Sequence, residues 1–303
     1  MKREMTSEED ITFKCLKWKN TPEGVRITGC DKSFEGSMVI PNFIDGVPVV
    51  EIGWKAFAEC ASLTSVVIPD SVEIVGENAF AACVNLEELR LGARIKAIGK
   101  GAFLECHSLR SVVIPDSAKT VGPEAFKLCT GLEELRLGEG VKKIGIRAFS
   151  ECYSLKSVAI PDSVEIVDKE AFRLCDGLEE LRLGKGVKKI ENRAFRSCYS
   201  LKSVVIPDNV EIIDEYAFAY CSKLEELRLG KRIKRIEEGA FNSCKSLKSV
   251  EIPGSVEVVG ECAFADCFEL EELRLGAGIT RIEENAIPYG VTIVVDADSY
   301  AEQ

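Results

Sequence analysis

Ten cysteines recur in this 303-residue chain at an unbroken interval of 23 residues, from Cys60 to Cys267. A phenylalanine keeps the same interval three residues earlier, from Phe57 to Phe264. A period of roughly 20 to 50 residues that persists along a chain is typical of a solenoid, in which each repeat packs only on its neighbours. The period therefore predicts a stacked array and argues against an enclosed active-site pocket.

Each repeat carries its own pattern of apolar residues. Counted from Leu63 as position 1, positions 1, 4, 6, 10, 13, 17, 18 and 21 are apolar or Cys in almost every copy. Positions 4 and 6 alternate like a short strand with one buried face, and positions 10 and 13 indicate a second extended segment. The Ala-Phe-x-x-Cys segment has the spacing of a single helical or 3₁₀ turn. We therefore expect a β-rich, right-handed solenoid of short strands and short helical or 3₁₀ turns.

The repeats also alternate in pairs, which gives a second period of 46 residues. Odd repeats carry Lys-Ser-Val-x-Ile-Pro-Asp, and even repeats carry Glu-Glu-Leu-Arg-Leu-Gly. Position 2 alternates in charge from Arg110 to Glu271. Parallel strands lie roughly 4.8 Å apart, so each such charge should face an opposite charge in the next layer. A solvent-exposed ladder of ion pairs is the simplest interpretation of this pattern.

The ends of the array differ from its middle. We expect a polar tail at residues 1–10 and one solenoid domain at 11–303, because no Gly/Ser/Pro linker interrupts the chain. Residues 11–34 contain two alternating segments joined by a turn and predict a β-hairpin cap. Residues 35–292 hold the repeats, the first of them stretched by five residues around 43–48. Residues 293–303 form the expected C-terminal cap.

The consensus Leu-x-x-Val-x-Ile-Pro-x-x-Val-x-x-Ile-Gly-x-x-Ala-Phe-x-x-Cys-x-x resembles the BspA-like (Treponema pallidum type) class of leucine-rich repeat. The resemblance covers about residues 11–301 and includes the entry segment Ile44-Asp45-Gly46-Val47-Pro48. It implies a leucine-rich-repeat fold in a non-enzymatic surface or secreted protein that engages host or partner proteins. A repeat class defines a scaffold and leaves the ligand open.

Composition excludes several classes of partner. Lys+Arg 39 against Asp+Glu 50 gives a net charge of −11, which disfavours nucleic acid. No apolar run approaches the roughly 20 residues of a membrane span, so we expect no membrane insertion. The first ten residues lack the apolar core of a signal peptide. The protein is therefore expected to be secreted or on the cell surface if a leader has been removed, and cytoplasmic otherwise.

Thirteen cysteines suggest metal or disulfides, but ten of them form a line with one thiol per coil. Zinc needs ligands that converge, so we expect these ten to be small buried hydrophobes and expect no metal or cofactor. Cys15 and Cys30 could bridge within the cap if the protein is exported. Cys262 falls at an outward position and is expected to be an exposed thiol.

Catalysis is not expected. The chain has one histidine, His107, so any triad that depends on histidine must use it. His107 falls at the variable position 22, at an expected surface edge. The chain has no Gly-rich phosphate loop.

Two surfaces are candidates for binding. The first is the strand face, formed by the outward residues at positions 3 and 5 of the repeats. Its charged members are Glu88, Arg90, Glu134, Arg136, Glu180, Arg182, Glu226, Arg228, Glu272 and Arg274. Arginine is enriched at interface hot spots, but each Arg here has a Glu two residues away, so mutually neutralised pairs are the alternative. The second surface is the edge at position 22, with His107, Tyr153 and Tyr199 at 46-residue intervals; these side chains would grip a repetitive partner or pack over a neighbouring turn.

These observations favour a non-enzymatic protein-binding scaffold, and the family resemblance implies that it acts in adhesion or host interaction as a bacterial surface protein or a secreted protein. The alternative is a structural element that self-associates, or a designed consensus scaffold without a natural ligand. The partner's identity is left open by the sequence.

Overall fold

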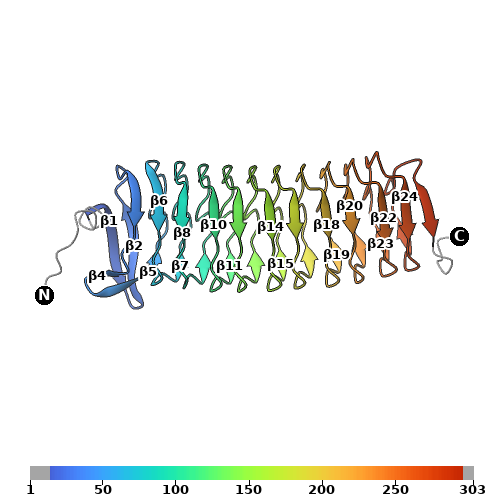
Figure 1. Cartoon of the computed structure of the whole chain (residues 1–303). Helices are drawn as coiled ribbons and strands as arrows, with labels where there is room; N and C mark the ends of the chain where they lie inside the picture. Colours follow the sequence, from blue (N-terminus) through green and yellow to red (C-terminus); the bar gives the residue numbers. More distant parts are fainter. Residues whose placement is uncertain (1–13, 296–303) are drawn as a thin grey trace.

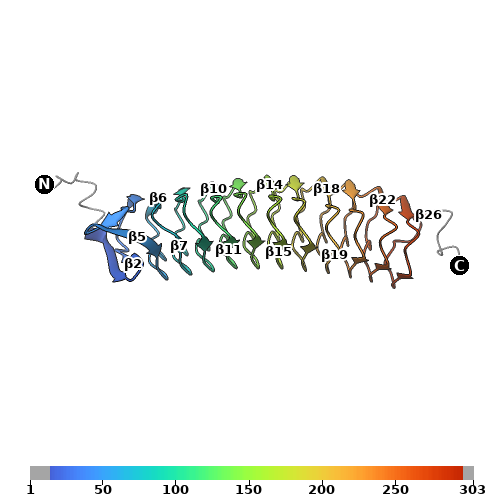
Figure 2. The same ribbon diagram turned by 90° about the horizontal axis from the view of Figure 1, so that it is seen from below.

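The computed structural model describes residues 14–295, which form a rod of stacked coils with β1 and β26 at opposite ends (Figure 1). Each coil contributes one strand to each of two rows, and Figure 2 shows these rows on opposite sides of the rod. In the regular part of the array, neighbouring coils pair in parallel with an offset of 23 residues, for example Thr120 with Lys143 and Lys143 with Ile166. The fold is therefore the β-rich leucine-rich-repeat solenoid that the sequence predicts.

The first row is a 14-stranded sheet, called here the long sheet. Its strands are β1 (Leu16–Thr21), β2 (Gly24–Cys30), β4 (Phe43–Ile44), β5 (Val47–Ile52), β7 (Ile74–Val75), β9 (Ala97–Ile98), β11 (Thr120–Val121), β13 (Lys143–Ile144), β15 (Ile166–Val167), β17 (Lys189–Ile190), β19 (Ile212–Ile213), β21 (Arg235–Ile236), β23 (Val258–Val259) and β25 (Arg281–Ile282).

The second row carries the strand face and is divided into a nine-stranded and a three-stranded sheet. The nine strands are β3 (Gly36–Val39), β6 (Leu63–Val67), β8 (Glu88–Arg90), β10 (Ser111–Val113), β12 (Glu134–Arg136), β14 (Ser157–Ala159), β16 (Glu180–Arg182), β18 (Ser203–Val205) and β20 (Glu226–Arg228). The three strands are β22 (Ser249–Ile252), β24 (Glu272–Leu275) and β26 (Thr292–Val295).

An antiparallel hairpin of β1 and β2 covers the N-terminal end of the long sheet. β2 then pairs in parallel with β5, and the buried Val25 and Ile27 extend the core into the hairpin. The stretched first repeat is accommodated by a second small hairpin, β4–β5, in which Phe43 pairs with Pro48. The expected tail at 1–10 lies outside the described residues. Of the expected C-terminal cap, only the end of β26 lies within them.

A column of ten phenylalanines forms the centre of the rod. The rings from Phe57 to Phe264 are fully buried. Consecutive rings stack almost parallel, with centroids 4.7–5.5 Å apart. This distance is close to the spacing of paired strands, about 4.8 Å, so offset ring stacking is compatible with the sheet pairing. The phenylalanine period in the sequence is thus the period of one continuous aromatic stack.

The Ala-Phe-x-x-Cys segment differs in detail from the expected helical or 3₁₀ turn. Non-glycine residues at positions 16 and 20 adopt positive φ in most repeats, for example Asn78 (53°) and Ala82 (58°). The amides of positions 16, 18 and 20 then point at the next coil, as in Phe80 N–H to Ala102 O (2.7 Å). A helix would direct these amides along its own segment. The segment is therefore a series of turns that forms a third hydrogen-bonded ladder, and this ladder compensates for the uncommon backbone conformation.

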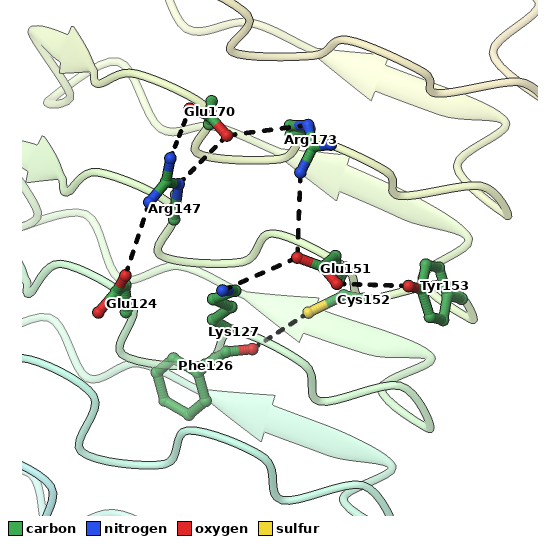
Figure 3. Close-up of polar contacts among 9 residues, drawn as sticks. All are labelled: Glu124, Phe126, Lys127, Arg147, Glu151, Cys152, Tyr153, Glu170 and Arg173. Carbon is green, nitrogen blue, oxygen red and sulfur yellow. Dashed lines mark hydrogen bonds and ion pairs between the residues drawn. The ribbon is translucent and has the colours of Figure 1, made fainter.

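The ten cysteines at position 21 are buried, as expected for small hydrophobes. The thiols from Cys83 to Cys267 also donate a hydrogen bond to the phenylalanine carbonyl 26 residues earlier, as Cys152 Sγ does to Phe126 O at 3.3 Å (Figure 3). Burial raises the pKa of the Cys175 and Cys267 thiols, that of Cys267 to about 12. A thiol rather than a methyl group is therefore useful at position 21, since it gives a carbonyl inside the core a hydrogen-bond donor from the next coil.

We expect Cys175→Ala to lower the free energy of unfolding by about 1–3 kcal/mol, the cost of an unsatisfied buried polar group. Cys175 Sγ donates to Phe149 O at 3.3 Å. Guanidinium unfolding under reducing conditions measures the change. Cys262→Ala is the matched control, because Cys262 is only half-buried and should change stability by less than about 0.5 kcal/mol. Equal effects of the two substitutions would show that the buried hydrogen bond contributes nothing.

Candidate protein-binding surface

Charged and small residues alternate from strand to strand on the strand face. At position 5, Ala159 on β14 lies opposite Arg182 on β16, and Val113 on β10 lies opposite Arg136 on β12. At position 3, serines alternate with glutamates in the same way. The strands hold both positions outward because positions 4 and 6 are buried in the coil. The structure thus brings all ten predicted residues onto one side of the rod.

The arginines of this surface differ in whether they are paired. Arg274 contacts Glu272 on its own strand at 3.4 Å. Among the residues that the structure describes, the side chains of the other four make no hydrogen bond or ion pair. These four are Arg90, Arg136, Arg182 and Arg228, and all are exposed. Four guanidinium groups, each with several donors in a planar fork, are therefore available to a partner.

At the rim of the strand face, charged side chains at position 2 form ion pairs between adjacent layers. At position 2, Lys202 contacts Glu179 at 2.6 Å and Arg110 contacts Glu133 at 3.6 Å. The contact with Lys202 lowers the pKa of the Glu179 carboxyl. These two contacts join adjacent layers, as the alternation of charge predicts.

A shallow depression of about 700 Å³ lies between Arg136 and Arg182, with Ala159 in its lining. The neighbouring odd strands carry Val113 and Val205 at the same position, with side chains 57% and 58% exposed. Alanine removes two methyl groups there and leaves room between the two arginines. The sequence shows that residue 159 is Ala where the neighbouring odd strands have Val, but only the structure shows that this Ala lines a depression between two arginines.

Side chains at the alternative edge, position 22, make hydrogen-bond contacts with nearby turn residues. His107 Nδ1 lies 2.9 Å from Leu128 O, and the Tyr153 hydroxyl donates to Glu151 at 3.4 Å (Figure 3). Glu151 is also within 4.0 Å of basic side chains from the adjacent coils. Burial raises the pKa of the Tyr153 phenol. Tyr153 and Tyr199 remain 39% and 41% exposed, so this edge combines local packing with some free aromatic surface.

Alternating charges also connect the turns beside this edge. The Arg147 guanidinium binds both oxygens of Glu170 at 2.9 and 3.1 Å and lies 3.9 Å from Glu124 (Figure 3). The pKa of Glu170 is lowered, chiefly by this hydrogen bonding. Arg147 is therefore neutralised within the chain, in contrast to the four free arginines of the strand face.

The described residues show no arrangement of three or more His, Cys, Asp and Glu side chains suited to a metal ion. Every cysteine that they include, Cys15 and Cys30 among them, is a free thiol. Between residues 14 and 295 there is no helix long and apolar enough to cross a membrane.

A family model described as the BspA type leucine rich repeat region matches residues 50–179 and 165–292. These matches span most of the chain, so the protein belongs to the BspA-type leucine-rich-repeat family. Its fold and family are those of repeat scaffolds for protein interaction.

Several solved structures are similar to this chain. The Treponema pallidum leucine rich repeat protein is 36% identical, with a TM-score of 0.58 over 62% of this chain and 88% of that one. A leucine rich cell surface protein of Faecalibacterium prausnitzii is 25% identical, with a TM-score of 0.48 over 95% and 94%. The pneumococcal vaccine antigen PcpA is 17% identical, with a TM-score of 0.53 over 93% and 94%. No curated protein matches the chain.

Proposed function

We propose that this protein is a non-catalytic scaffold that binds a protein partner through its strand face, in adhesion or host interaction at the cell surface or after secretion. The observation that carries the proposal is the row of four exposed arginines without an intramolecular partner. Because the sheet already fixes the backbone beneath these guanidinium groups, binding restricts only their side chains, which favours affinity. The family resemblance supports the surface location and the absence of catalysis.

The depression at Ala159 deepens the centre of this surface. A partner side chain that enters between Arg136 and Arg182 would be held on two sides by charged donors. Arginine contacts of this kind are frequent among the few residues that dominate binding energy. We therefore place the centre of the contact on β12, β14 and β16.

The test is retention of a partner from host-cell and matrix extracts. We expect the wild-type protein to hold a defined partner that Arg136→Glu/Arg182→Glu/Arg228→Glu loses. The matched control reverses the same number of charges away from the strand face, at Lys100, Lys119 and Lys142, and should retain the partner. Ala159→Val restores the residue of the neighbouring odd strands and should weaken retention without loss of stability. Equal retention by all variants would exclude the strand face as the binding surface.

A further inference from the structure

Two rows of opposite charge run side by side along the strand face. The acidic row holds the position-3 glutamates and the basic row holds the position-5 arginines of the same strands. From β8 to β20 both rows carry a charge on every second strand, as the pairs Ser157–Glu180 and Ala159–Arg182 show, whereas β22 carries Glu251 at position 5. The repeat along each row is therefore two strand spacings, about 9.6 Å.

This arrangement is complementary to itself under one symmetry operation. Consider a two-fold axis that runs parallel to the rod, above the line between the two rows. It turns a second copy over so that its basic row lies on the acidic row of the first copy. Rotation about this axis does not shift the layers, so Arg182 of one copy meets Glu180 of the other. The same residues contribute on both sides, as a two-fold interface requires.

The other two-fold axis in the plane of the face gives the opposite result. An axis parallel to the strands places arginine row on arginine row and glutamate row on glutamate row. Like charges that face each other across an interface disfavour association. The charge pattern therefore selects two rods that lie in the same direction, with both N-terminal caps at the same end.

We propose that the strand face binds the strand face of a second copy of this chain in this parallel arrangement. The inference rests on the proposed function, since it takes the strand face to be a protein-binding surface, and it names the chemistry of one partner. The four free arginines would find carboxylates, and the exposed Val113 and Val205 would be covered by the second copy.

The size of the face sets the strength of the association. The strands from β8 to β24 span about 40 Å, and four residues of strand span about 13 Å, which gives roughly 500 Å² per copy. Stable interfaces bury about 800 Å² per partner, so this contact should be weak and reversible. Because its ion pairs lie at the surface, it should also weaken as salt rises.

The first experiment is sedimentation of the purified full chain, which has a monomer mass of 33.3 kDa. From about 10 to about 300 µM in ~50 mM salt, we expect the mean mass to rise toward twice this value, and to fall back in ~500 mM salt. A monomer throughout the range in low salt overturns the inference.

Two charge variants provide the decisive comparison. Arg136→Glu/Arg182→Glu/Arg228→Glu makes the centre of the face wholly acidic, and Glu134→Arg/Glu180→Arg/Glu226→Arg makes it wholly basic. Each alone should associate at least about tenfold more weakly than wild type. Their equimolar mixture should associate again, whereas a mixture that stays monomeric contradicts the proposal. Since all six residues are exposed, loss of folding is not a competing explanation, and the Lys100/Lys119/Lys142→Glu control should behave as wild type.

A cross-link tests the direction of the two rods. Ser111→Cys copies should be joined to each other by a bis-maleimide reagent about 10 Å long, since parallel rods bring the same layers together. Antiparallel rods would separate these thiols by about 29 Å, six strand spacings, and prevent the cross-link. These measurements use purified protein alone. Retention of an extract partner by a monomeric protein would therefore refute self-pairing while the proposed function stands.

Discussion

Phe172→Ala should lower the free energy of unfolding by about 3–5 kcal/mol, the usual cost of removing a buried aromatic side chain. Phe172 lies in the middle of the aromatic column, between Phe149 and Phe195, with ring centroids 5.2 and 5.4 Å away. The substitution breaks two stacking contacts, each worth about 0.5–1.5 kcal/mol beyond area burial. Because each coil packs only on its neighbours, the loss is concentrated in the two interfaces on either side of Phe172.

Chemical unfolding followed by circular dichroism measures this loss. We expect a lower midpoint and a broader transition, since a weakened centre lets the two halves of the rod unfold separately. Phe268→Ala is the matched control, as Phe268 is 72% exposed, and it should shift stability by less than about 0.5 kcal/mol. Similar effects at both sites would show that a ring in the buried column contributes no more to stability than an exposed ring.

Removal of residues 1–31 should cause the protein to aggregate. The deletion takes away β1 and β2 and leaves the edge of β5 without its hydrogen-bonded neighbour. It also uncovers core beneath Val25 and Ile27, which are fully buried, and breaks the 2.6 Å ion pair between Arg26 and Glu51. An exposed strand edge next to apolar surface is a template for pairing with other chains.

Light scattering after size-exclusion chromatography detects this change. The measurement is made in about 0.5 M salt, which screens ion pairs between strand faces and so separates aggregation from self-pairing. A protein that lacks only residues 1–10 serves as the control and should elute like the full chain. A monomeric product after removal of the hairpin would mean that the hairpin does not act as a cap.

The repetitive part of the fold could be predicted in detail because its signals are repeated ten times. The Phe and Cys periods predicted the stack and its buried thiols, and the position-2 alternation predicted the contact between Lys202 and Glu179. The turn ladder could not be predicted, because Ala-Phe-x-x-Cys fits a helical turn equally well. Only the pairing with the next coil selects positive φ at residues such as Asn78 and Ala82.

The sequence predicted which residues form the candidate surface, but it did not predict whether their charged side chains pair with each other. Sequence order places Glu180 and Arg182 on one side of a strand, which suggests either a mutual pair or a free site. The choice depends on side-chain geometry, and the contact forms in β24 between Arg274 and Glu272 but not at Arg182. The hydrogen bonds from the thiols of Cys83 to Cys267 to phenylalanine carbonyls could not be predicted from the period either, since each joins residues 26 apart in neighbouring coils.

The alternation of strands also restricts how such a protein can change in length. A Val or Ala strand always separates two Arg strands along β6 to β20, as in the pair Val113–Arg136. Loss of a single Val or Ala repeat would bring two arginine strands together about 4.8 Å apart, with their glutamates also adjacent. Loss of a single arginine repeat would instead bring position-2 lysines such as Lys156 and Lys202 together. Loss or gain of two repeats leaves every neighbour unchanged. An array of this kind is therefore expected to change in length by two coils at a time, which is about 9.6 Å.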